Sequence, residues 1–158
     1  MDNLNPTVRD GRSRRVEMRM KDGKMVEVTE ESIFELIRDI KDPEHPYTLE
    51  QLNVVDLEKV RIVDLNEERE VLINDIGITR CIEVEFTPTV PHCSLVGIIG
   101  LTLAYKLYKH VDGFMIRLKI TENSHSQEEI YNKQLNDEER VHAAFENTNL
   151  HEIIENCL

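Results

Sequence analysis

The sequence predicts an α+β fold, namely one small domain with a mainly three-stranded sheet, helices packed on one face, and a helical C-terminal third. Three observations predict it. Residues 57–65, 80–87 and 114–121 alternate apolar and polar side chains, which is typical of half-buried strands. An apolar stretch at 94–110 has the length of a buried helix. From residue 122 onward the apolar spacing is helical.

A helix is expected to begin after Thr29, whose hydroxyl can cap it and which is followed by two glutamates. Its apolar face ends before Pro43, because proline cannot continue a helix. Residues 48–52 predict a single helical turn. Upstream, apolar residues alternate on both sides of Asp22-Gly23, which indicates a short hairpin.

The last third predicts three helices, at 127–134, 137–146 and 149–157, with Asp137 as the cap of the middle one. A minor strand is expected at 70–74. Together with the elements above, these helices give the order α-β-β-α-β-α of a single α+β domain with helices on one face of a small sheet.

The length of 158 residues suits one domain with a core that needs no covalent crosslinks. Residues 1–24 hold seven Lys or Arg against four acids, a net charge of +3, whereas the whole chain has −12. We therefore divide the chain into a basic, largely disordered arm at 1–28 and a domain at 29–158.

Composition excludes several classes of protein. A net charge of −12 repels phosphate backbones, and 5% aromatic residues are too few for a large base-stacking surface, so direct binding of nucleic acid is not expected. No apolar run is long enough for a signal peptide or a membrane span, so a cytoplasmic and nuclear location is expected. Thiols stay reduced there, and the three cysteines form no C-x-x-C pair.

The run from Thr87 to Ser94, TPTVPHCS, is the most unusual segment. Two prolines rigidify the exit from a strand and present His92 and Cys93 where the next helix begins. A thiol at a helix N-terminus is favoured as thiolate, the form that binds soft metals or attacks electrophiles. The alternative interpretation is a small buried cysteine beside a loop histidine.

Two further groups stand out. Gly97 and Gly100 lie in the predicted buried helix, where their small size indicates close packing of that helix on the sheet. His125 in a polar turn and Glu152 and Glu155 on the last helix are residue types that can hold a divalent metal, although surface glutamates are mostly solvated.

Three runs, TPTVPHCSLVGIIGL, DPEHPYTLEQLNVV and NKQLNDEERVHAAFENTNL, resemble the eukaryotic MIP-eighteen family, relatives of SufT- and PaaD-type domains. The resemblance covers about residues 29–158. It implies a non-enzymatic component of the cytosolic iron–sulfur assembly targeting complex. Such a component delivers clusters to cytosolic and nuclear apoproteins, including DNA helicases and polymerases, and has a linked role in chromosome segregation.

The resemblance also implies a functional thiol at Cys93 and metal ligands at His92, His125, Glu152 and Glu155. The implied cofactors are a transient iron–sulfur cluster or iron, or zinc at a dimer site. The implied partners are a WD-repeat propeller, a HEAT-repeat adaptor, clients such as an XPD-type helicase, and a second copy of the chain in a domain-swapped homodimer.

Three alternatives stay open. The chain could be a pure protein-interaction scaffold without thiol chemistry. It could be a cysteine-dependent hydrolase that pairs Cys93 with a histidine, which would need a substrate cleft and an oxyanion hole. It could use residues 97–100 as a KH-like phosphate clamp for RNA, although the two intervening isoleucines and the acidic body oppose this.

Overall fold

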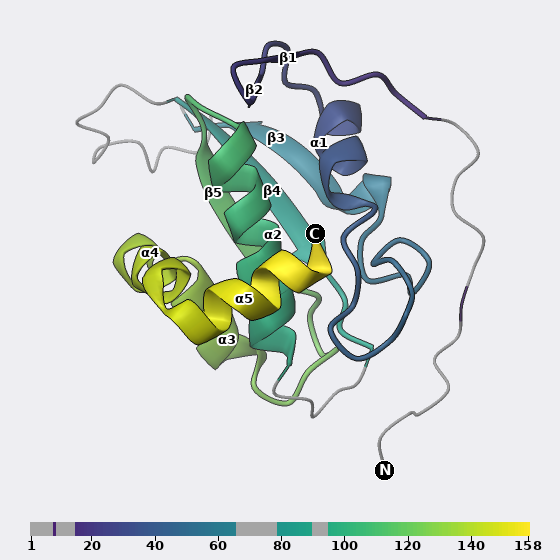
Figure 1. Cartoon of the computed structure of the whole chain (residues 1–158), viewed down its shortest axis with the longest axis vertical. Helices are drawn as coiled ribbons and strands as arrows, with labels where there is room; N and C mark the ends of the chain where they lie inside the picture. The colour runs from purple at the N-terminus through teal and green to yellow at the C-terminus, as the bar shows by residue number, and fades with distance from the viewer. Residues whose placement is uncertain (1–7, 9–14, 66–78, 90–94) are drawn as a thin grey trace.

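The structure, a computed structural model, describes residue 8 and residues 15–65, 79–89 and 95–158. Figure 1 shows the path of the chain. In chain order the described elements are β1 (Met20–Lys21), β2 (Lys24–Met25), α1 (Glu30–Ile37), a 3-10 turn (Leu57–Lys59), β3 (Val60–Asp64), β4 (Arg80–Phe86), α2 (Val96–His110), β5 (Met115–Ile120), α3 (Glu128–Leu135), α4 (Glu138–Glu146) and α5 (Thr148–Cys157).

The main sheet has the strand order β3-β4-β5. β3 and β4 are antiparallel, whereas β4 and β5 are parallel and are joined through α2. The three predicted strands are thereby confirmed, each shorter by one to four residues than its alternating segment. The predicted minor strand at 70–74 lies outside the described residues.

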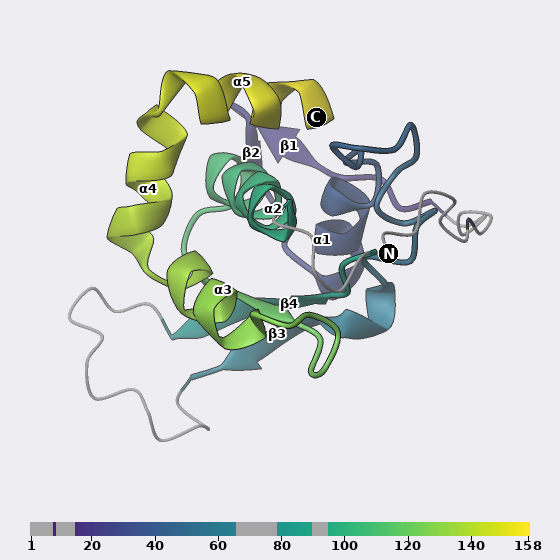
Figure 2. The same ribbon diagram turned by 90° about the horizontal axis from the view of Figure 1, so that it is seen from below.

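The helices cover one face of this sheet, as predicted. Figure 2 shows α2 end-on near the centre, with the sheet on one side and the other helices and the β1–β2 hairpin around it. Ile82, Val84 and Phe86 point from β4 into this core and are completely buried. The opposite face is polar, since Glu83 forms ion pairs there with Arg61 of β3 and Arg117 of β5. An apolar face against the helices and a polar face toward solvent are expected for a sheet that is covered on one side only.

α1 begins as predicted. The Thr29 hydroxyl accepts a hydrogen bond from the N–H of Ser32 at 3.0 Å, and the N–H of Thr29 donates to the Ser32 hydroxyl at 2.8 Å. This reciprocal pair is a capping box. The helix ends at Ile37, well before Pro43, and the predicted turn at 48–52 is closed by a 3.1 Å bond from the N–H of Leu52 to the carbonyl of Thr48.

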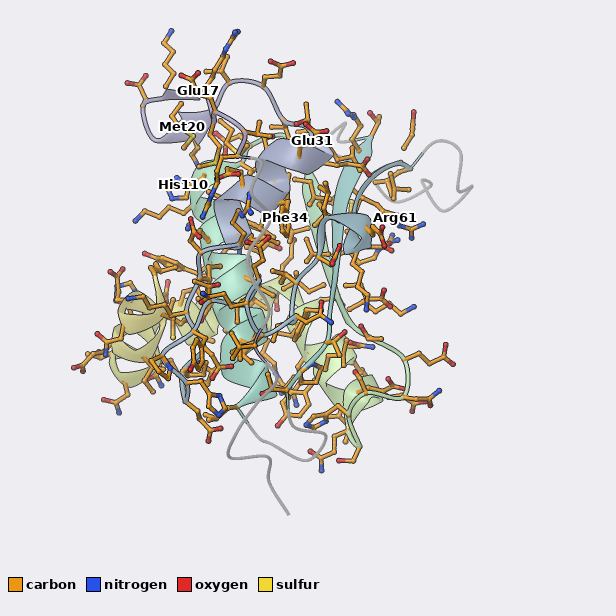
Figure 3. The ribbon with its side chains drawn as sticks, turned by 90° about the vertical axis from the view of Figure 1, so that its right-hand side faces the viewer. Glu17, Met20, Glu31, Phe34, Arg61 and His110 are labelled. Atoms are coloured by element: carbon orange, nitrogen blue, oxygen red, sulfur yellow. The ribbon has the colours of Figure 1, made fainter. Side chains whose placement is uncertain are left out.

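The predicted hairpin at Asp22-Gly23 is also confirmed. β1 and β2 pair antiparallel, and the two turn residues have positive φ angles of 53° and 80°. The hairpin lies against the C-terminal end of α2, where His110 Nδ1 is 2.8 Å from the carbonyl oxygen of Gly23. Figure 3 shows Met20 beside this end of α2, with His110 below it. The division of the chain at residue 28 stays a prediction, but residues 15–28 lie against the domain.

Candidate functional site

The predicted thiol Cys93 and its neighbour His92 lie outside the described residues, so their proposed roles stay predictions. The structure describes both ends of their segment. Thr87–Thr89 follow β4, and Leu95 precedes α2. The candidate site is therefore defined here by what holds these two ends.

The first end is held by a polar triad at the carboxyl ends of β4 and β5. The hydroxyls of Thr87 and Thr121 are 2.7 Å apart, and Lys59 Nζ donates to both oxygens at 3.1 Å. The N–H of Thr87 also donates to the carbonyl of Val54 at 2.8 Å. The next residue, Pro88, is buried. The chain therefore leaves β4 from a fixed position.

Sequence reasoning did not find Lys59. The only signal was that Thr87 and Thr121 are each the last residue of a predicted strand, and neighbouring parallel strands end at the same edge of a sheet. Lys59 precedes the antiparallel neighbour β3, so it meets them at that edge as well.

The second end is the start of α2. The sequence predicted a helix over residues 94–110, whereas the helix begins at Val96 with Leu95, which has no polar side-chain atom, in the cap position. Its first turn contains no acidic residue. The positive end of the helix dipole therefore meets no carboxylate of that turn, which suits a neighbouring anion.

The two glycines of α2 contact α3, which corrects the expectation that they pack on the sheet. A Cβ atom built on Gly97 would lie 3.1 Å from a ring carbon of Tyr131. One built on Gly100 would lie 2.5 Å from a methyl carbon of Leu135. Glycine thus lets α3 approach closely enough to fix the first two turns of α2.

His125 lies near this same end of α2. Its side chain is buried, its Nδ1 atom accepts a 3.0 Å hydrogen bond from the N–H of Gln127, and its ring meets Tyr131 edge-on at 5.5 Å. Because Tyr131 also contacts Gly97, His125 is one ring away from the first turn of α2. It lines a polar groove of about 330 Å³ together with the first residues of α3.

The predicted glutamates belong to α5, and Glu155 contacts α2 at a later turn. Glu155 accepts a hydrogen bond from the Tyr105 hydroxyl at 3.3 Å and is 3.4 Å from His151 Nε2, while Glu152 is exposed. Burial, with the nearby Glu155 charge, raises the pKa of Tyr105. Tyr105 follows Gly97 by eight residues, or roughly 12 Å of helix. Within one chain, His125 and Glu155 therefore lie against different turns.

Across the described ranges, no three His, Cys, Asp or Glu side chains are grouped closely enough to hold a metal ion. The predicted set also needs His92, which is outside those ranges, and the family resemblance involves dimers. The four-ligand metal site therefore stays a prediction.

The other two cysteines are buried. Cys81 is 1% exposed and Cys157 is 4% exposed. Burial, with the negative charge of Asp42, raises the pKa of the Cys157 thiol. Cys157 is packed at the end of α5, where its carbonyl accepts a 2.8 Å bond from the N–H of Lys41. Neither thiol is suited to react, because both are shielded from solvent and the reactive form of a cysteine is the charged thiolate.

The chain is similar over most of its length to several known proteins. A MIP18 family protein of Caenorhabditis elegans is 43% identical over 162 residues, covering 100% of this chain and 94% of the relative. The MIP18 family protein galla-2 of Drosophila melanogaster is 38% identical over 161 residues, covering 100% and 95%. Cytosolic iron-sulfur assembly component 2B of Mus musculus is 44% identical over 127 residues, covering 80% and 70%.

No family model matches the chain. A search of the described helices for a membrane span finds none that is both long and apolar enough.

Proposed function

The chain belongs to the MIP18 family, and on this premise we propose that it is a component of cytosolic iron–sulfur protein assembly that passes clusters to apoproteins. The observation that carries the proposal is the 44% identity over 127 residues to a mouse protein named as a cytosolic iron–sulfur assembly component. A relative of the same name in Dictyostelium discoideum is 42% identical over 134 residues. The proposed role is that of an assembly component, without turnover of a small substrate.

In this proposal Cys93 is the functional thiol and the cluster is cargo. Support comes from the two ends of its segment, which are held by the Lys59 triad and by the packing of α2 on α3. In this proposal the two fixed flanking segments serve to position Cys93 for a transient contact with iron. One thiol supplies only part of the ligands of a cluster, so the others must come from a partner, a client or a second copy.

The finer parts of the proposal follow the resemblance noted above. The partners would be a WD-repeat propeller and a HEAT-repeat adaptor, and the clients would be cytosolic and nuclear apoproteins such as DNA polymerases and an XPD-type helicase. A linked role in chromosome segregation is part of the same proposal. His92, His125, Glu152 and Glu155 would bind iron or zinc only where two copies meet in a swapped dimer.

The test is rescue of cells depleted of the endogenous protein. Wild-type chain, Cys93→Ala and Cys157→Ala are expressed at equal levels, and ⁵⁵Fe incorporation into immunoprecipitated client proteins is measured. We expect Cys93→Ala to fail. Cys157→Ala should rescue, because the buried Cys157 thiol is not accessible to iron. Full rescue by Cys93→Ala would remove the thiol from the mechanism and favour the scaffold alternative.

Anaerobic reconstitution with iron and sulfide separates the same two alternatives in vitro. Wild-type chain and Cys93→Ser are compared by visible absorbance, with and without an apo-client. If both chains gave the same spectrum, Cys93 would not contact the cluster.

A further inference from the structure

Two carboxylates one helical turn apart, Glu35 in α1 and Asp39 just after it, hold the guanidinium group of Arg15. Arg15 Nη1 is 3.0 Å from Glu35 Oε1 and 2.8 Å from Asp39 Oδ2, and Nη2 is 3.1 Å from Asp39 Oδ1. Asp39 is thus bound through both of its oxygens. This fork geometry matches the planar guanidinium of arginine and has no equivalent for the ammonium of lysine.

The same site also recognises main chain. The N–H of Val16 donates to Glu35 Oε2 at 3.2 Å, so the group that is bound is an arginine together with the next backbone amide. Arg15 and Val16 lie outside any helix or strand, so the bound segment leaves its backbone groups open to such contacts.

The site is supported from beneath by a buried arginine. Arg38 Nη1 donates to Glu35 Oε2 at 3.0 Å. The Arg38 side chain is itself 2% exposed and makes three bonds of 2.9–3.1 Å to Glu50. Because Arg38 and Glu50 are both buried, Glu35 has a second, fixed partner besides Arg15.

The pKa values of the two carboxylates shift in the direction that these hydrogen bonds predict. Hydrogen bonds from Arg15 lower the pKa of Asp39. Burial would raise the pKa of Glu35, but bonds from Arg15, Val16 and Arg38 outweigh it and lower that pKa. Lys106 of α2 also stabilises the Asp39 carboxylate through its charge. Both carboxylates are therefore ionised at neutral pH when Arg15 is in place.

Arg15 is held but not enclosed. Its side chain is 53% exposed and that of Asp39 is 55% exposed, so the contact is at the surface. Exposed ion pairs add little net stability, which makes such a ligand exchangeable. A chain with a net charge of −12 also attracts basic partners.

We propose that Glu35 and Asp39 form a recognition site for an arginine-containing segment of a partner protein, and that Arg15-Val16 is its competitor within the chain. The partner segment would place an arginine on the two carboxylates and the following N–H on Glu35. Binding would then require release of the contact at Arg15. This inference goes beyond the proposed function and does not rest on Cys93.

The test uses the full chain and a fluorescent peptide with the sequence of residues 12–20, RSRRVEMRM, as the probe. A matched peptide differs only by Lys at the place of Arg15. Binding is measured by anisotropy to wild-type chain, Arg15→Ala and Arg15→Ala/Asp39→Asn. We expect the arginine peptide to bind Arg15→Ala about two- to fivefold more tightly than wild type, because release of an exposed ion pair costs little, and the lysine peptide about twofold more weakly than the arginine peptide.

Equal binding to Arg15→Ala and to Arg15→Ala/Asp39→Asn, or no binding to Arg15→Ala at millimolar peptide, would overturn the proposal and leave Arg15 as a structural tether. The Val16 amide resonance gives a second measurement in wild-type chain, since the peptide should shift it toward its position in Arg15→Ala. An unmoved Val16 signal at saturating peptide would also count against it. Thermal unfolding of each variant verifies that it is folded.

Discussion

Asn136 bonds the backbone of Leu118 as a neighbouring strand would. Its Oδ1 atom accepts from the N–H of Leu118 at 3.0 Å, and its Nδ2 atom donates to the carbonyl of Leu118 at 2.7 Å. One turn earlier, Asn132 Oδ1 accepts from the N–H of Ile120 at 2.7 Å. Two amides four residues apart thus satisfy both backbone groups of Leu118 and the N–H of Ile120 along β5, groups that could otherwise pair with another chain.

Replacement of Asn136 by Ala is expected to lower the free energy of unfolding by about 1 kcal/mol, because the Leu118 groups lose two hydrogen bonds. Asn136→Asp should cost more, since a carboxylate would face the Leu118 carbonyl oxygen without a donor between them. Urea unfolding measures both. Lys133→Ala, at an exposed position of α3, the helix that Asn136 directly follows, is the control and should be nearly neutral. If Asn136→Ala matched the control, the edge contact would contribute nothing to stability.

Gly100→Ala is expected to destabilise the fold more than Gly97→Ala. The new Cβ atom would lie 2.5 Å from a Leu135 methyl carbon at position 100, but 3.1 Å from the Tyr131 ring at position 97. Overpacking costs about 1–3 kcal/mol, whereas alanine improves helix propensity by about 1 kcal/mol. The net loss at position 100 should therefore reach about 2 kcal/mol.

A double-mutant cycle identifies the cause of that loss. Leu135→Val removes the methylene that brings the methyl groups toward Gly100, so Gly100→Ala should cost less in that background than alone. Additive losses in chemical denaturation would show that the contact with α3 is not the reason.

Stability is expected to fall in acid partly through Glu83. Burial would raise the pKa of Glu83, but hydrogen bonds from Arg61 and Arg117 outweigh it and hold the pKa below its usual value. A carboxyl with a depressed pKa in the folded state stabilises the fold above its unfolded pKa near 4.5, and this contribution is lost as the pH falls through the folded value.

Urea midpoints measured between pH 7 and pH 3 test this. The drop below pH 4.5 should be smaller in Glu83→Gln than in wild type, while Glu58→Gln, an exposed control on the 3-10 turn, should follow wild type. Identical pH profiles for Glu83→Gln and wild type would contradict the role given to the two arginines.

One thiol per folded chain is expected to react quickly with iodoacetamide at pH 7. Cys81 and Cys157 are 1% and 4% exposed, and thiolates rather than thiols react. Cys93→Ser should abolish the fast phase, and urea should expose the other two thiols. Mass spectrometry of labelled peptides identifies the site. A fast phase that survives in Cys93→Ser would contradict the assignment of Cys93 as the reactive thiol.

The elements were predictable because their signals are local. The Thr29 cap, the Asp22-Gly23 turn and the alternation in β4 each depend on residues within a few positions of one another, and each appears in the structure where the sequence indicated. The order of the strands and the parallel pairing through α2 also follow from a strand-helix-strand pattern.

The site was less predictable because its contacts join distant segments. Lys59 meets Thr121 across 62 positions, and Arg38 meets Glu50 inside the core, yet neither pair has a recognisable spacing. His125 and Glu155 were grouped by residue type and by the family resemblance, and within one chain the packing around α2 holds them against different turns.

The sequence by itself determined the class of fold, the start and end of most helices, and the family, since these depend on periodicity, caps and long motifs. Only the tertiary structure decided that Gly97 and Gly100 face α3, that asparagine amides bond backbone groups of β5, and that Arg15 is seated on Glu35 and Asp39. The physical reason is that such contacts depend on which surfaces meet when the chain closes, and residue spacing carries no record of that.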